Sequence, residues 1–282
     1  MEPREITIGH SPDADDAFMF YALTQGKLDT GGLTFRHVIA DIETLNHRAV
    51  EGELDVTALS AHAYGYVMDK YALLPSGGSF GEGCGPVVVA ARPMDVGEMA
   101  DDRIAVPGTM TTAYLLLKLL LMNFKFEVVP FDKIIDAVKS GQVDAGLLIH
   151  EGQLTYRDHG LHKVIDLGEW WHADTGLPVP LGVNAVRKDL GKQLMMKLSE
   201  LLTASIRYAL DHREEAVAYA QQFARGLDRG RTEQFCGMYV NRWTLDMGKE
   251  GRQAITRLLT RAYHSALIPR PVNLEFVESP TT

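Results

Sequence analysis

Short apolar runs alternate with segments of helical spacing along most of this chain, a pattern typical of an α/β protein. Strands are predicted over residues 6–9, 33–38 and 56–59, with helices over 17–23 and 41–50 between them. Glycine and aspartate separate these segments, as expected at turns. The first part of the chain therefore forms one α/β unit.

A second α/β unit is predicted after it. Residues 86–92, 103–106 and 127–131 are extended and apolar, and helical spacing separates the later runs. Residues 145–149 form a continuous apolar run, as expected for a buried strand of a parallel sheet. From about residue 190 onward the spacing of leucines is helical.

Two similar extended segments flank the second unit. Residues 86–92 and 178–188 both begin with proline, continue with an apolar run and contain an arginine near the end. We interpret them as the two connections between lobes. The expected layout is a discontinuous larger lobe (1–89 and 184–282), an inserted smaller lobe (90–183), and a cleft that closes by a hinge.

Polar residues follow several predicted strands, at the edge where open α/β sheets bind ligands. Ser11, Glu43, Ser60, Thr111 and His150 occupy such positions. Ser60 and Thr111 also precede predicted helices, so each is expected either to cap its helix or to face a ligand. The pattern leaves both roles open.

His150 directly follows the apolar run that ends at Ile149. A histidine near its usual pKa of ~6.5 can accept a proton at neutral pH, whereas a structural histidine would bond a backbone carbonyl. Glu151 adjoins it, but neighbours on an extended chain point to opposite sides. The group that orients the imidazole is therefore left open.

Three aspartates, Asp13, Asp15 and Asp16, precede the first helix. No glutamate follows at the distance of a calcium-binding loop, so helix capping is the better interpretation. The glycine-rich residues 76–86 lack the lysine of a phosphate loop and do not fit the dinucleotide fingerprint. We expect neither a metal nor a cofactor.

Composition narrows the class of protein further. The 282 residues are 46% hydrophobic and 23% charged, which suits a globular protein of one large or two ordinary domains. The net charge of -9 argues against nucleic acid as a partner. Cys84 and Cys236 form neither a metal motif nor a disulfide framework.

The apolar segments also bear on location. The first residues lack the apolar core of a secretion signal, and the apolar run over residues 113–124 is too short to span a bilayer. We expect a cytoplasmic protein with a small-molecule substrate and no membrane partner. Its oligomeric state is left open, with a homodimer as one alternative.

An ordered set of motifs gives the chain a family resemblance. These are Ser11-Pro12 with Asp16 and Phe18, residues 20–23, 43–46, 59–60, 76–78, 106–108 and 111–114, and Ile149-His150-Glu151. Along nearly its whole length the chain resembles the 1,4-dihydroxy-6-naphthoate synthases of the futalosine route to menaquinone. The resemblance implies the two-lobed fold of type II periplasmic binding proteins, reworked as a cytoplasmic enzyme. It also implies that cyclic dehypoxanthine futalosine is opened to the dihydroxynaphthoate and a sugar-derived fragment.

The same resemblance implies site residues. His150 would be the general base, and the substrate would be held by Ser11, Asp15, Asn46, Ala58, Leu59, Ser60, Thr111 and Thr112. The first loop departs from the family pattern Ser-Pro-Cys-Pro-Asn-Asp-Thr-Phe, because Asp13 stands in place of the cysteine and Asp15 in place of the asparagine. An added carboxylate near a carboxylate-bearing substrate is unfavourable unless it is paired or capping, which leaves the substrate more open than the fold.

Three other functions are compatible with this pattern. One is a cytosolic solute-binding protein of the same fold, and another is a chorismate dehydratase of the same pathway. The third is a related lyase that acts on another molecule. His150-Glu151 at the strand end favours the synthase over the dehydratase. Turnover against mere binding would separate an enzyme from a binder.

Overall fold

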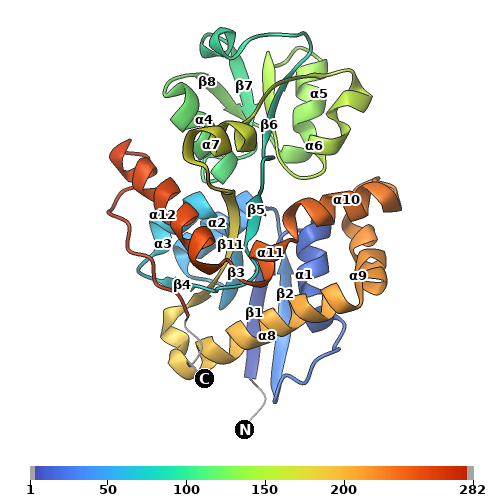
Figure 1. Cartoon of the computed structure of the whole chain (residues 1–282), viewed down its shortest axis with the longest axis vertical. Coiled ribbons are helices and arrows are strands. Elements are labelled where there is room, and N and C mark those ends of the chain that lie inside the picture. The colour runs from blue at the N-terminus through green and yellow to red at the C-terminus, as the bar shows by residue number, and fades with distance from the viewer. Residues whose placement is uncertain (1–3, 278–282) are drawn as a thin grey trace.

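The computed structural model describes residues 4–277, which form two α/β lobes (Figure 1). The sheet of the larger lobe has the order β2-β1-β3-β11-β4, with β5 paired to β11. Its strands are β1 (Arg4–His10), β2 (Leu33–Ile39), β3 (Val56–Ser60), β4 (Tyr71–Leu73), β5 (Ser79–Gly81) and β11 (Val179–Arg187). The central strand β3 is buried at every position, as expected for a strand covered on both faces.

The register of this sheet brings the ends of β3 and β11 together. β1 runs parallel to β2 and β3, whereas β11 runs antiparallel to β3. Ser60 therefore lies opposite Gly182, and Ala58 lies opposite Asn184. This pairing places polar groups from segments far apart in the sequence at one edge of the sheet.

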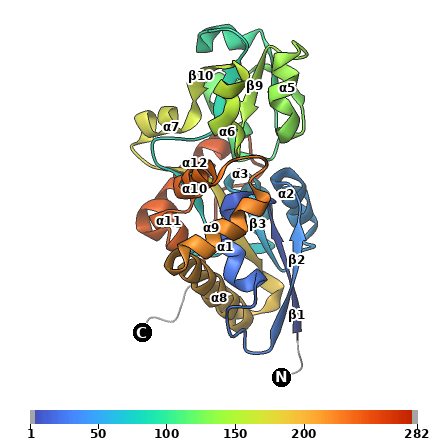
Figure 2. The same ribbon diagram turned by 90° about the vertical axis from the view of Figure 1, so that its right-hand side faces the viewer.

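Helices cover both faces of the larger-lobe sheet. They are α1 (Ala14–Thr24), α2 (Ile42–Glu51), α3 (Ala61–Val67), α8 (Lys192–Asp211), α9 (Arg213–Ala220), α10 (Arg229–Tyr239), α11 (Arg242–Leu245) and α12 (Gly248–His264). α1 is apolar nearly all round and is packed against α8, α9 and α10, so the C-terminal helices enclose the N-terminal one (Figure 2). This packing holds the loop before α1 in a fixed place.

The smaller lobe is built on a mixed sheet of order β10-β6-β9-β7-β8. Its strands are β6 (Val87–Ala90), β7 (Arg103–Val106), β8 (Lys125–Val128), β9 (Ala145–Leu148) and β10 (His162–Asp166). The helices are α4 (Thr112–Leu121), α5 (Ile134–Lys139), α6 (Gly152–Thr155) and α7 (Leu167–Thr175), and single turns of 3-10 helix form η1 (Val96–Ala100), η2 (Phe131–Lys133) and η3 (Tyr156–His159). β9 is parallel to β7 but antiparallel to β6.

The chain crosses between the lobes before β6 and again before β11. β6 lies wholly in the smaller-lobe sheet and β11 wholly in the larger-lobe sheet. Both crossovers thus come a few residues earlier than the boundaries expected at residues 90 and 183, which fall inside these two strands. The proline-led runs are strands of one sheet each, and the turns before them make the connection.

Several elements differ from the sequence-based expectation. β4 and β5 were not predicted, because three-residue strands carry too little periodicity. α7 was also not predicted; it begins after Asp166, whose carboxylate accepts from the N–H groups of Gly168 at 2.8 Å and Glu169 at 3.1 Å. No helix within residues 4–277 has both the length and the apolar character needed to cross a membrane.

The first crossover is packed tightly against the start of α7, which predicts the effect of Gly168→Ala. The added Cβ would lie 2.1 Å from the Cys84 carbonyl oxygen, and backbone cannot move aside as a side chain can. We expect the free energy of unfolding to fall by about 1–3 kcal/mol in urea denaturation. Gly97→Ala, where the new Cβ meets no atom within 4 Å, is the matched control. Equal stability of the two variants would contradict this account.

Candidate active site

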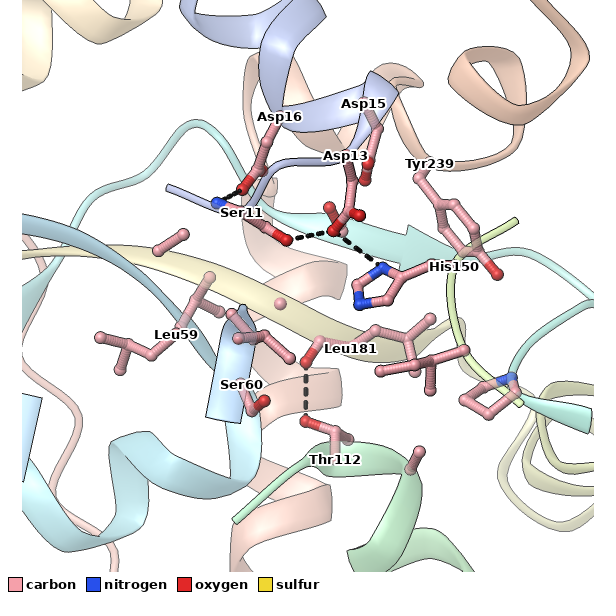
Figure 3. A pocket seen from close by; sticks show the side chains of 18 of the residues that line it. Ser11, Asp13, Asp15, Asp16, Leu59, Ser60, Thr112, His150, Leu181 and Tyr239 are labelled. Carbon is pink, nitrogen blue, oxygen red and sulfur yellow. Dashed lines mark hydrogen bonds and ion pairs between the residues drawn. The ribbon is translucent and has the colours of Figure 1, made fainter. Parts of the chain in front are cut away.

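A cavity of about 100 Å³ lies between the lobes (Figure 3). The larger lobe contributes the loop before α1, the ends of β3 and β11, and part of α10. The smaller lobe contributes the start of α4 and the segment that follows β9. Asp13, Asp15 and Asp16 gather with Ser11 on one side of it, Ser60 and Thr112 lie on the other, and the His150 ring is between them (Figure 3).

His150 follows β9 in a left-handed backbone conformation, with φ of 57°. Non-glycine residues rarely adopt positive φ, and such strain persists where the surrounding structure holds it. The Gln153 N–H donates to the His150 carbonyl at 3.1 Å and closes the turn. The imidazole lines the cavity, and its Nδ1 lies 2.9 Å from Oδ2 of Asp13.

Asp13 is the group that orients His150, which the sequence left open. It occupies the N-cap position of α1 but makes no capping hydrogen bond, so the prediction that it caps the helix is wrong. Its Oδ2 instead accepts from the Ser11 hydroxyl and faces His150. Asp16 accepts from the backbone N–H of Ser11 at 2.6 Å and fixes the loop. The spacing of the three aspartates could not show which one faces the cleft.

A cation on the larger lobe contacts the same carboxylate. Arg225 Nη1 lies 3.1 Å from Asp13 Oδ1 and 3.6 Å from Glu151 Oε2. Its Nη2 donates to the Pro12 carbonyl at 3.2 Å. The sequence analysis did not identify Arg225, because it lies in a C-terminal turn with no motif around it.

The charges around His150 set its protonation. Burial disfavours the imidazolium, but attraction and a hydrogen bond from Asp13, with further attraction from Glu151 and Asp15, raise the pKa of His150 to about 9. Burial opposes ionisation of Asp13 as well, yet His150 and Arg225 together lower its pKa below the usual value. The pair is therefore ionic at neutral pH, unlike the unperturbed histidine expected from the sequence.

The other two aspartates of the loop, Asp15 and Asp16, have raised pKa values, whereas that of Asp13 is lowered. Burial and the neighbouring charge of Asp13 raise the pKa of Asp15 to about 7. Burial and the charge of Asp15 raise the pKa of Asp16 well above its usual value. Two carboxyl groups beside the cavity thus hold protons to much higher pH than exposed ones do.

Ser60 lies on the opposite side of the cavity, supported from behind by Asn46. The Ser60 N–H donates to Asn46 Oδ1 at 2.9 Å, and Asn46 Nδ2 donates to Ser60 Oγ at 3.1 Å. Ser60 lines the cavity with its β3 neighbours Ala58 and Leu59, whereas Asn46 does not. No residue among 4–277 accepts the Ser60 hydroxyl hydrogen, so that donor is free for a ligand.

Thr111 and Thr112, at the start of α4, differ in their relation to the cavity. Thr111 caps α4, accepting from the Tyr114 N–H at 3.2 Å, and its side chain is outside the cavity lining. Thr112 lines the cavity, but its hydroxyl donates to the Leu181 carbonyl at 2.6 Å and accepts from the His62 N–H at 3.2 Å. It therefore bridges the lobes beside the cavity.

Of the other predicted contacts, Ser11 and Asp15 both line the cavity. Glu43 does not: its carboxylate reaches the smaller lobe and accepts from the Met110 N–H at 3.1 Å. Sequence reasoning missed Gln153, Tyr239 and Asn184, which also line the cavity. Gln153 lies in the short helix α6, Tyr239 ends α10 and Asn184 lies within β11, and nothing in the local pattern marks any of them as a ligand contact.

The side chains that the structure describes around the cavity form no metal-binding cluster. Across residues 4–277 no three His, Cys, Asp or Glu side chains are arranged to hold a metal ion. The acidic residues at the cavity are engaged with His150, Arg225 and backbone amides instead. The arrangement suits proton transfer by an imidazole that a carboxylate orients.

Comparison with known proteins places this geometry in context. A protein family described as "Menaquinone biosynthesis" matches residues 6–264. The chain is 43% identical to a 1,4-dihydroxy-6-naphtoate synthase of Thermus thermophilus, over 95% of this chain and 98% of that protein. It is 40% identical to a protein of the same name from Streptomyces coelicolor, over 95% of this chain and 96% of that protein.

Solved structures extend the comparison to the fold. A crystal structure of a protein from Archaeoglobus fulgidus is 49% identical, with a TM-score of 0.90 over 94% of this chain and 98% of that one. The alkanesulfonate-binding protein of Xanthomonas axonopodis is only 12% identical, yet it superposes with a TM-score of 0.71 over 96% of both chains. The predicted fold of periplasmic binding proteins is thus confirmed.

The raised pKa of Asp15 predicts a pH-dependent effect of Asp15→Asn. In the unfolded chain this carboxyl has its ordinary pKa of 3.8, whereas in the folded protein its pKa is about 7. Wild-type stability is therefore lost between these two values as the pH rises, and an asparagine avoids that loss. Since the wild type alone loses this stability over about two pH units, we expect the advantage of the variant to grow by on the order of 2–3 kcal/mol from pH 5 to pH 8.

Urea denaturation at both pH values measures the difference. Asp211→Asn, at an exposed position outside the cavity lining, controls for the loss of one acidic group. A gain for Asp15→Asn that is the same at pH 5 and pH 8 would contradict the raised pKa.

Proposed function

The chain belongs to the menaquinone-biosynthesis family of 1,4-dihydroxy-6-naphthoate synthases, and from this premise we propose that it uses His150 as the general base that opens cyclic dehypoxanthine futalosine. The products would be 1,4-dihydroxy-6-naphthoate and a sugar-derived fragment. The enzyme class follows from the family, whereas the substrate and the base are our assignment.

One observation carries the assignment of the base. His150 Nε2 is shielded from solvent and has no hydrogen-bond partner among residues 4–277, while Nδ1 faces Asp13 at 2.9 Å. The ring loses its proton as the pH passes about 9. In the neutral ring, a carboxylate at Nδ1 favours the tautomer whose proton is on Nδ1, which leaves the lone pair on Nε2. The free nitrogen belongs to a side chain that lines the cavity, where a bound substrate would present its proton.

The proposed reaction begins with transfer of a substrate proton to Nε2. Loss of that proton starts cleavage of a carbon–carbon bond, and formation of the aromatic naphthoate drives the reaction forward. The resulting imidazolium is stabilised by the Asp13 carboxylate, which need not accept a proton itself. This step requires no metal ligand and no bound nucleotide.

The distribution of charge in the cavity supports one orientation of the substrate. Among residues 4–277, no lysine or arginine lines the cavity, and three aspartates lie on one side of it. We place a substrate carboxylate on the other side, beside Ser60 and the start of α4, because a free hydroxyl and helix amides there can donate to it. The reacting part of the molecule would then lie next to His150.

His150→Asn tests the base directly. Asparagine keeps a polar side chain of similar reach but cannot accept the proton, so we expect turnover to fall roughly 10²–10⁴-fold while ligand affinity is largely kept. Single-turnover formation of the fluorescent naphthoate from cyclic dehypoxanthine futalosine measures the first, and calorimetric titration measures the second.

His162→Asn, an exposed histidine of the same lobe, is the matched control and should keep full turnover. An undiminished rate in His150→Asn would remove His150 as the base. Tight binding without turnover in the wild type would instead favour the role of a binding protein.

Ser60→Ala tests the holding of the substrate. Loss of one hydrogen bond from a free hydroxyl should weaken binding by about 1 kcal/mol, or more if a charged oxygen is left unpaired, with a smaller effect on the bound-state rate. Ser140→Ala, on an exposed turn after α5, is the control. An unchanged dissociation constant in Ser60→Ala would show that the substrate does not contact this hydroxyl.

A further inference from the structure

We infer that Asp13 and Arg225 are positioning residues for His150, which hold its imidazole in place from the opposite lobe. This inference rests on the proposed role of His150 and extends it. Asp13 stands where the family pattern has a cysteine, so the device belongs to this chain and not to the pattern by which the family resemblance was identified.

His150 and Asp13 come from different lobes. His150 follows β9 of the smaller lobe, whereas Asp13 lies at the end of the loop between β1 and α1 of the larger lobe. Their contact of 2.9 Å therefore spans the cleft. Any opening of the lobes by a few ångströms would break it and leave the imidazole without an orienting carboxylate.

Arg225 lies in the turn between α9 and α10 of the larger lobe and contacts both lobes. It contacts two groups of its own lobe, Asp13 Oδ1 and the Pro12 carbonyl. It also contacts two groups of the smaller lobe, since its guanidinium lies 4.3 Å from the centre of the Phe131 ring and Nη1 lies 3.6 Å from Glu151 Oε2. One side chain thus joins both lobes around the base.

The Phe131 ring links Arg225 to the imidazole. It packs edge-on against His150 with ring centres 4.9 Å apart and also carries the guanidinium of Arg225. The ring orientation of His150 is thereby fixed by Phe131 as well as by Asp13. Displacement of Arg225 would loosen both supports together.

Backbone conformation points to the same place. Non-glycine residues with positive φ between residues 4 and 277 are Met122, His150, Arg225 and Ala266. Two of these, His150 at 57° and Arg225 at 42°, belong to this single cluster and approach it from opposite lobes. Strained backbone on both sides is expected where tertiary contacts hold a functional arrangement.

The charges facing His150 determine what removal of each partner should do. These groups are Asp13, Asp15 and Asp16 from the larger lobe, Glu151 from its own segment, and Arg225. Asp13 contributes most to the raised pKa of the imidazole, so its loss should lower that pKa. Loss of Arg225 should weaken the same effect, because an unsupported Asp13 ionises less readily.

Asp13→Asn is the principal test, with Arg225→Gln beside it. We measure the pH dependence of kcat/KM and, separately, the NMR titration of the His150 ring, identified by its absence in His150→Asn. The wild-type rate should rise toward alkaline pH, because the neutral imidazole forms as the pH passes about 9. In Asp13→Asn both the rate inflection and the ring titration should move to lower pH by at least one unit, and the rate plateau should fall roughly 10²-fold or more.

Arg231→Gln is the matched control for Arg225→Gln. Arg231 also forms an ion pair across the cleft, with Asp158, but it does not touch Asp13 or His150. Removal of Arg231 should leave the rate inflection and the His150 ring titration at their wild-type pH. Arg225→Lys should shift them less than Arg225→Gln does. Thermal unfolding of each variant confirms that it is folded.

The outcomes separate this inference from the proposed function. If Asp13→Asn lowers the rate but leaves both the rate inflection and the His150 ring titration at their wild-type pH, the positioning role of Asp13 is overturned. Equal effects of Arg225→Gln and Arg231→Gln would overturn the role of Arg225. Wild-type protein without turnover would overturn the proposed function, whereas a shifted ring titration in Asp13→Asn would still support the pairing.

Discussion

The contact between the Asp13 carboxylate and the His150 imidazole is the interaction on which the site depends, because it joins two lobes that the chain links by two crossovers. Each partner is shielded from water, so neither could hold its charge alone at neutral pH without a large cost. Arg225 completes the cluster by contacting the second carboxylate oxygen. The contact that joins the lobes is therefore also the one that orients the imidazole.

Other cross-lobe contacts lie on the far side of the cavity and support the same closed arrangement. The Glu43 carboxylate receives the Met110 N–H, and the Thr112 hydroxyl joins the Leu181 carbonyl to the start of α3. Glu43 and Thr112 were candidates for substrate contacts from the sequence, but their polar atoms bond the opposite lobe. In the closed protein they shape the cavity, and Ser60 is left with a free donor.

The three aspartates beside the cavity differ in their ionisation. Asp15 and Asp16 hold protons to unusually high pH, while Asp13 remains ionised through His150 and Arg225. The aspartate in place of the family's asparagine at position 15 is compatible with this arrangement, because burial favours its neutral form.

The sequence by itself determined the α/β class, the order of most strands and helices, and the position of His150 at a strand end, since these depend on local periodicity and on motif order. It also placed Ser60 at the cavity. The exact crossovers and the short strands β4 and β5 depended on pairing between distant segments, which periodicity does not encode. Only the tertiary structure decided that Asp13 faces His150 instead of capping α1, that Arg225 supports it, and that Thr111 and Asn46 stand behind the lining. The physical reason is that capping and cleft-facing positions share one local pattern, and a side chain's partner is chosen by which remote segment packs beside it.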